Sequence, residues 1–303
     1  MQESVSNKKN SSLHIGAKLK DYLKLVKPSL SIMVVFSSVV SFLLTPSLNV
    51  NYESPLQMAI LLAIGGLLVT GSANAINQIV EKETDKMMKR TATRPIASGR
   101  MSELEGWIFA IITGIVGVLM LGYFFNWLAA GLAAFSLFLY AFIYTPLKKV
   151  NSIAVLVGAF PGALPCLIGW SAGEDKLSTG GWVLFALQFF WQFPHFWAIA
   201  WMAHQDYSKA GFKLLPSQKG PTKFTALQTI IYALLLIPVG VLPYFIEMSG
   251  LISLIIVTGA NFFMLWQCIR LYRDMEIISA RRVMFSSYIY LPIVLLALLG
   301  DKV

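Results

Sequence analysis

The sequence predicts an all-α fold, a polytopic membrane helix bundle with about nine transmembrane helices. Of its 303 residues, 56% are hydrophobic and only 13% are charged, whereas roughly a quarter of the residues in a soluble domain are charged. So few charges could not cover the surface of a soluble protein of this length. The apolar runs are long enough for helices to cross about 30 Å of hydrocarbon, and they lack the alternation of a transmembrane barrel. Helices are therefore the structure that satisfies the backbone in lipid.

The chain begins with a polar segment. Residues 1–27 contain six lysines, and the first apolar stretch starts too late for a secretory signal. We therefore expect residues 1–27 to form a cytoplasmic N-terminal tail and residues 28–303 to form a single transmembrane domain. The apolar segments of that domain lie, in chain order, at roughly 29–48, 55–77, 107–124, 127–145, 150–171, 179–202, 224–246, 250–270 and 284–300.

Basic residues predict the orientation in the lipid bilayer. With the N-terminus inside, all but two of the 24 Lys and Arg residues fall in inside segments, the exceptions being Lys176 and Lys302. Cytoplasmic loops carry such an excess of positive charge. The pattern predicts a multi-pass protein of the cell inner (cytoplasmic) membrane with a cytoplasmic N-terminus. It also accounts for the net charge of +9 without a nucleic-acid partner.

The strongest polar pattern begins at the inner end of the second segment. Asn77, Glu81 and Asp85, here called the oxygen ladder, are spaced four residues apart, which on a helix keeps the three side chains on one face. A carboxylate that faces lipid costs about 2.5–3.5 kcal/mol near the bilayer centre. We therefore expect the helices to surround a central cavity that opens towards the cytoplasmic side. Such a row of oxygen ligands suits Mg²⁺.

Arginines follow the oxygen ladder at Arg90, Arg94 and Arg100, and guanidinium groups bind phosphate oxygens well. The alternative is a solvated helix end held by ion pairs between close neighbours, such as Glu81 with Lys86. At the inner face, Asp85 is expected to be a surface-facing acid that contributes little to packing.

The segment 179–202 carries His195 within an aromatic-rich apolar run. A histidine there can ligate a metal, contact a haem or move a proton. The alternative is a hydrogen-bonded histidine packed among aromatic rings. Asp206 and Lys209 follow at the inner face, on the same side as the oxygen ladder.

The segment 127–145 ends in Tyr144-Thr-Pro146-Leu-Lys148-Lys. Pro146 is expected to end the helix. Paired lysines at an inner interface are normally orientation signals, yet Tyr144 and Lys148 lie four apart and could reach the same inner cavity. In the next segment, Gly158 and Gly162 form a GxxxG pattern, which is typical of close helix packing.

These residues resemble a known family. The oxygen ladder, followed by Arg90-Thr and Arg94-Pro, is similar to the first polyprenyl-diphosphate motif of the UbiA-type intramembrane prenyltransferases. Glu81 and Glu83 stand where that family has Asp, and Cys166 stands where it has Pro. The resemblance covers about residues 20–300. The stretches that resemble the haem O synthase (protohaem IX farnesyltransferase) branch are 144–149, 162–170, 191–196, 206–207 and 214–216.

The resemblance implies transfer of a farnesyl group from farnesyl diphosphate to a vinyl group of haem b, which gives haem O, the precursor of haem A in terminal oxidases. It also implies contact with haem A synthase or oxidase assembly factors. On this basis His195 is the candidate for the haem side. The residues expected to hold Mg²⁺ are Asn77, Glu81, Asp85 and Asp206, and those expected to hold the diphosphate are Arg90, Arg94, Lys148, Lys209 and Tyr144.

Two other functions are compatible with the sequence. One is a UbiA-type enzyme that prenylates another acceptor, such as a quinone precursor or a lipid. The other is a transporter or a non-catalytic oxidase assembly protein. Transporters place their charged site near the bilayer midplane. Here the acids and bases gather at the inner face, which favours chemistry on a diphosphate that arrives from the surface.

Overall fold

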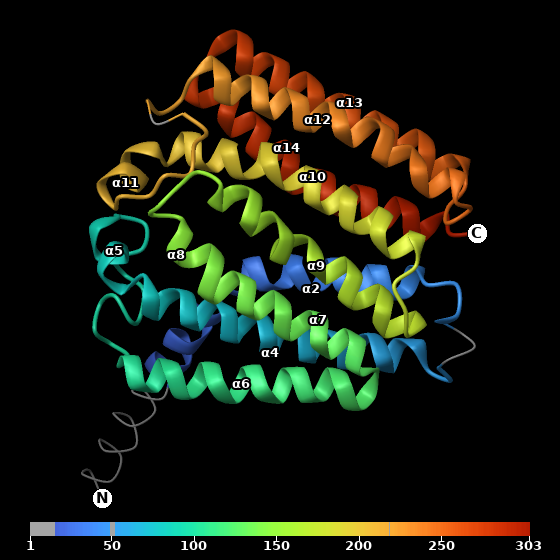
Figure 1. Ribbon diagram of the computed structural model, residues 1–303, viewed down its shortest axis with the longest axis horizontal. Coiled ribbons are helices and arrows are strands. Elements are labelled where there is room, and N and C mark those ends of the chain that lie inside the picture. The colour runs from blue at the N-terminus through green and yellow to red at the C-terminus, as the bar shows by residue number, and fades with distance from the viewer. Residues whose placement is uncertain (1–15, 49–51, 218) are drawn as a thin grey trace, which may run out of the picture.

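The computed structural model describes residues 16–48, 52–217 and 219–303, so residues 1–15 of the expected tail lie outside the described residues. Within the described ranges the regular elements are helices, apart from a lone β-bridge between Ser249 and Lys302 (Figure 1). Eight helices there are long and apolar enough to span a membrane. A ninth span is a pair of helices, Gly16–Val26 and α2 (Pro28–Leu44), bent by 51°. The predicted all-α membrane bundle is confirmed.

The spanning helices follow the predicted segments in order. Two short helices, α5 (Lys82–Met87) and α11 (His204–Lys209), lie in the loops after the second and sixth spans. Both lie at the same end of the bundle, which is here called the inner end (Figure 1). The spans themselves are α2 (Pro28–Leu44), α4 (Pro55–Val80), α6 (Glu103–Phe124), α7 with η1 and α8 (Trp127–Leu147), α9 (Ala154–Glu174), α10 (Thr179–Met202), α12 (Lys223–Phe245), α13 (Leu251–Asp274) and α14 (Ile277–Gly300).

Several helices extend beyond the apolar segments at their inner ends. α14 starts well before the predicted position 284, and its first turns carry the exposed Arg281 and Arg282. α6 also starts early, where the Ser102 side chain accepts a hydrogen bond from the Glu105 backbone N–H and caps the helix. Helices continue beyond the hydrocarbon into water, where charged side chains are solvated. Hydropathy therefore detects only the apolar part of each helix and misses these polar ends.

Part of the predicted tail is helical and docks on the rest of the protein. Arg100 Nε donates to Asp21 Oδ1 over 2.9 Å, and Lys18 Nζ lies 2.7 Å from Glu105 Oε2. The helix Gly16–Val26 is thereby held against the start of α6. Arg100 is thus engaged in docking this helix.

The most enclosed spans are α9 and α10, which lie in the middle of the bundle (Figure 1). A Cβ atom at Gly169 of α9 would overlap with the backbone oxygen of Ser38 on α2, so the two helices cross at close range. The predicted close packing at Gly158 and Gly162 is also confirmed. There a Cβ would meet the ring of Tyr144 or the side-chain amide of Gln192, so each glycine makes room for a side chain of another helix.

Candidate active site

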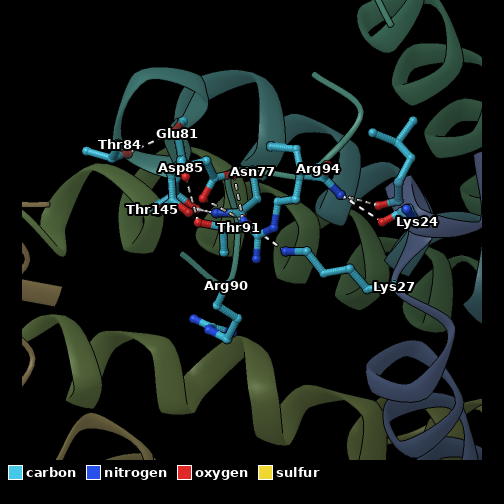
Figure 2. Close-up of polar contacts among 12 residues, drawn as sticks. Lys24, Lys27, Asn77, Glu81, Thr84, Asp85, Arg90, Thr91, Arg94 and Thr145 are labelled. Atoms are coloured by element: carbon cyan, nitrogen blue, oxygen red, sulfur yellow. Dashed lines mark hydrogen bonds and ion pairs between the residues drawn. The ribbon is translucent and has the colours of Figure 1, made fainter. Parts of the chain in front are cut away.

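The oxygen ladder lies at the inner end of the bundle, where α5, α8 and α11 gather (Figure 1). Asn77 is in the last turn of α4, Glu81 is at the break between α4 and α5, and Asp85 is in α5. The helical path continues through the break, because the Asp85 backbone N–H donates to the Glu81 carbonyl over 2.7 Å. The three residues are 2%, 4% and 0% exposed, respectively. The spacing therefore delivers three buried oxygen-bearing side chains to one place (Figure 2).

Asp85 forms a close ion pair with Arg94. Nη1 of Arg94 donates to Oδ1 over 2.8 Å and to Oδ2 over 2.7 Å. Burial raises the pKa of the Asp85 carboxyl, and the positive charge of Arg94 opposes that shift. The expectation that Asp85 faces the surface and contributes little to packing is wrong. The chain folds back over α5 after Asp85, and Thr91 Oγ1 donates to the Asp85 backbone oxygen over 2.9 Å.

Lysines from distant parts of the chain bind the other two residues of the oxygen ladder, Glu81 and Asn77. Lys148 Nζ lies 2.5 Å from Glu81 Oε1, and both side chains are at least nine-tenths buried. Lys27 Nζ donates to Asn77 Oδ1 over 2.8 Å (Figure 2). The alternative of a solvated helix end is wrong for Glu81, whose partner is Lys148 rather than Lys86. Each residue of the oxygen ladder is thus bound by a basic side chain.

Lys27 is a site residue that the sequence analysis missed, since it was counted among the basic residues of the tail. Lys27 lies at the bend between the helix Gly16–Val26 and α2, with a left-handed backbone (φ 49°, ψ 70°). Residues other than glycine rarely adopt that conformation. The bend lets the side chain reach the oxygen ladder. The position of Lys27 directly before Pro28 marks the start of α2, but it does not predict the left-handed backbone, since a residue before proline favours an extended conformation.

Tyr144 and Lys148 contact each other at the inner end of the fourth span. Lys148 Nζ lies 4.7 Å from the centroid of the Tyr144 ring and 5.5 Å from that of Phe212. A π-helix, η1 (Leu139–Tyr144), ends at Tyr144. It continues into α8 (Thr145–Leu147), which runs one residue past Pro146 before it ends. Pro146 therefore does not end the helix itself. Single π-helical turns are frequent at functional sites, and this one sets the register of both side chains.

Arg90, Asp206 and Lys209 are less closely joined to the oxygen ladder. Arg90 extends away from it (Figure 2), and its Nη2 donates to the hydroxyl of Tyr207 over 3.2 Å. Asp206 and Lys209 flank Tyr207 on α11, and neither side chain has a hydrogen bond or ion pair with any described residue. Through Tyr207, α11 is thus linked to residues 88–102, here called the arginine loop. Next to this link is a cavity of ≈ 470 Å³, lined in part by Tyr207 and Phe212.

The ligand atoms of the oxygen ladder suit a small, hard cation. They are one amide oxygen and two carboxylates, and Mg²⁺ is usually held by one or two carboxylates, with water and phosphate oxygens as its other ligands. In the described ranges, no three Asp, Glu, His or Cys side chains cluster closely enough to hold a metal ion alone. These residues therefore fit Mg²⁺ that arrives together with a phosphate-bearing molecule.

His195 lies on α10, deeper in the bundle. Its Nδ1 is 2.7 Å from Ser287 Oγ on α14, and its ring stacks on Trp191 with the centroids 4.9 Å apart. The ring of Tyr288 meets it edge-on at 5.0 Å. Its surroundings are those of a hydrogen-bonded histidine among aromatic rings. Its Nε2 atom, however, has no polar partner among the described residues.

Known proteins match this chain over almost its whole length. The UbiA prenyltransferase family model matches residues 34–290. The chain is 42% identical to a protoheme IX farnesyltransferase of Cytophaga hutchinsonii, over 95% of this chain and 100% of that protein. It is 40% identical to a protoheme IX farnesyltransferase of Flavobacterium johnsoniae, over 98% and 99% of the two chains.

Solved structures share the fold. A structure of digeranylgeranylglyceryl phosphate synthase superposes with a TM-score of 0.72 at 23% identity, over 94% of this chain and 98% of that one. A UbiA homolog from Archaeoglobus fulgidus, bound to GPP and Mg²⁺, gives a TM-score of 0.67 at 17% identity, over 92% and 99%. Likeness at these identities concerns the fold, whereas the family match rests on sequence. The chain therefore belongs to the UbiA prenyltransferase family.

Proposed function

We propose that this protein transfers a farnesyl group from farnesyl diphosphate to a vinyl group of haem b and so makes haem O. The observation that carries the proposal is the buried oxygen ladder, in which a basic side chain binds each of the three residues. This arrangement supplies both ligands for a metal ion and partners for a diphosphate. The similarity to proteins named protoheme IX farnesyltransferase supports the choice of acceptor.

The diphosphate end of the substrate meets the cations at the inner face. Arg94 and Lys148 lie beside the oxygen ladder, and Arg90 and Lys209 flank it from the arginine loop and α11. Lys27 joins them from the N-terminal bend. Positive charges placed where negative charge develops lower the barrier to departure of a leaving group. These side chains therefore bind the diphosphate and stabilise it as it leaves the allylic carbon.

Asn77, Glu81 and Asp85 are the residues that would hold Mg²⁺, with Asp206 on α11 as a fourth ligand. The ion would neutralise charge on the diphosphate oxygens. Tyr144 packs against Lys148 and holds that lysine at the site. Asp206 has no ion-pair partner among the described residues, so its carboxylate is available to a ligand on the α11 side.

The farnesyl chain and haem b occupy the apolar part of the bundle. In a central cavity that opens towards the cytoplasmic side, the Phe, Trp and Leu side chains of the spans would enclose the farnesyl chain and keep water from the carbocation-like centre. His195 is the candidate for the haem side. The basic inner loops support a cytoplasmic N-terminus in the inner membrane, with residues 1–27 on that side and residues 28–303 as the enzymatic domain. Delivery of haem O to haem A synthase or oxidase assembly factors completes the proposal.

The test is a reaction with purified protein, haem b, farnesyl diphosphate and Mg²⁺, followed by mass analysis of the haem. We expect a product heavier than haem b by a farnesyl group and a hydroxyl group, because the vinyl group takes up the farnesyl group and a hydroxyl from water while diphosphate and a proton are released. Lys148→Met should abolish it, while Lys149→Met, a change at the exposed neighbouring lysine, should leave it intact. Unmodified haem, together with farnesylation of a quinone precursor, would refute the choice of acceptor.

A further inference from the structure

The imidazole of His195 is fixed to α14 through one serine. His195 Nδ1 lies 2.7 Å from Ser287 Oγ, and Ser287 Oγ donates to the carbonyl oxygen of Met284 over 2.6 Å. Trp191, which stacks on the imidazole, donates its Nε1–H to the Ser287 backbone oxygen over 2.9 Å. Ser287 is fully buried. Stacking on Trp191 therefore fixes the plane of the His195 ring, and the hydrogen bond with Ser287 holds the ring by Nδ1.

The positions of the hydrogens follow from these contacts. The Ser287 hydroxyl has one hydrogen, and the Met284 carbonyl, which can only accept, is its nearer partner at 2.6 Å, so we assign the hydrogen to that bond. Ser287 Oγ must then accept from His195, which places the imidazole hydrogen on Nδ1. A neutral imidazole carries one N–H, so Nε2 has a free lone pair. No polar atom of the described residues contacts Nε2.

We propose that Nε2 of His195 binds the iron of haem b and that Ser287 is a positioning residue that holds His195 in the tautomer required for this. The proposal rests on haem b being the acceptor. Histidines that bind metals almost always donate their other N–H to a nearby acceptor, which fixes the tautomer and orients the ring. Histidine is also a common ligand of haem iron. In this protein the acceptor is the hydroxyl of Ser287.

The depth of His195 agrees with a role at the acceptor. His195 lies seven residues before the inner end of α10 at Met202, which is about 10 Å along a helix. The oxygen ladder and its cations lie at the inner end itself. Iron bound at His195 would thus leave the cation cluster free for the diphosphate. The ring of Phe196, whose centroid is 5.6 Å from that of His195, adds apolar surface for a porphyrin.

The test compares two adjacent serines of α14. Ser287→Ala removes the acceptor for Nδ1–H, and Ser287→Thr keeps a hydroxyl there. Ser286→Ala is the matched control, since Ser286 Oγ donates to the Arg282 carbonyl and does not contact His195. Haem b is titrated into each detergent-purified protein, and the Soret band is followed. Farnesyl diphosphate binding is measured on the same samples with Mg²⁺.

We expect Ser287→Ala to weaken haem binding about 10- to 100-fold, the usual effect of losing such a partner, and to shift the Soret band. Ser287→Thr and Ser286→Ala should behave as wild type, and His195→Ala should lose the ligated spectrum, with added imidazole restoring it. Farnesyl diphosphate binding should stay unchanged in every variant. An unchanged Soret band and affinity in Ser287→Ala or His195→Ala would overturn the inference, even if haem O is formed. A His195-dependent haem spectrum without haem O would instead refute the proposed function alone.

Discussion

Replacing Asp85 by Asn removes one charge of the buried pair with Arg94 and keeps the size of the side chain. The Asp85 side chain has no exposed surface, and that of Arg94 is 19% exposed. Removal of one partner from a buried ion pair typically costs about 3–5 kcal/mol, because the other charge is left unpaired. Since Arg94 is partly reached by water, we expect Asp85→Asn to lower the free energy of unfolding by about 3 kcal/mol.

A double-mutant cycle separates the pair from the individual residues. Arg94→Gln should also destabilise the protein, since it leaves the buried Asp85 carboxylate unpaired. The double variant should lose less than the sum of the single variants by about 1.5–3 kcal/mol, the range for hydrogen bonds to charged groups. Glu83→Gln is the control, since the ion pair of Glu83 with Lys86 is largely exposed and should change stability by less than about 1 kcal/mol.

The assay is thermal unfolding of the detergent-purified variants, combined with calorimetric titration of farnesyl diphosphate in the presence of Mg²⁺. Asp85→Asn should lose tight binding, since a carboxylate of the oxygen ladder is gone. Strictly additive effects in the cycle would refute the reasoning, because they would mean that the two side chains do not interact. Stability of Asp85→Asn equal to that of Glu83→Gln would show that Asp85 is not a buried charge.

Three further outcomes are expected. Removal of divalent cations with EDTA should abolish farnesyl transfer, and added Mg²⁺ should restore it; turnover that persists in EDTA would contradict the metal assignment. Lys148→Met should weaken farnesyl diphosphate binding roughly ten- to a hundredfold, as expected when a charge-assisted hydrogen bond of about 1.5–3 kcal/mol is lost, whereas equal binding by Lys148→Met and Lys149→Met would count against the site. Gly169→Ala should destabilise the protein by about 1–3 kcal/mol through overpacking against α2, as measured by thermal unfolding, and Gly259→Ala, where a Cβ would meet nothing within 4 Å, should not.

Local sequence patterns predicted the features that depend on nearby residues. Hydropathy located the spans, and the four-residue spacing brought Asn77, Glu81 and Asp85 together, because both signals come from a single helix. The burial of Asp85 was missed, since it depends on how the chain folds back over α5. Which arginine would face Asp85 was equally hidden: Arg94 pairs with it, while Arg100 holds Asp21 of the N-terminal helix.

Contacts between distant segments were the main features that the sequence did not reveal. The bond from Lys27 to Asn77 depends on a 51° bend between two helices, and a tail of ordinary lysines contains little sign of it. The partner of His195 is Ser287, on the last span. A serine in an apolar segment gives no signal of its own, because helical serines commonly bond to their own backbone, as the neighbouring Ser286 does.

The cations on the oxygen ladder have a consequence for the order in which ligands bind. On the proposed assignment, Mg²⁺ that approaches Asn77, Glu81 and Asp85 would compete with the side chains of Lys27, Lys148 and Arg94. A diphosphate would compete with the ladder for the same three basic side chains. Binding of Mg²⁺ would therefore free the basic side chains for the diphosphate, and binding of the diphosphate would free the ladder oxygens for Mg²⁺. Linkage requires that each tighten the binding of the other by the same factor. On that assignment, the protein would select the complete metal–diphosphate complex over free metal ions and over uncomplexed phosphates.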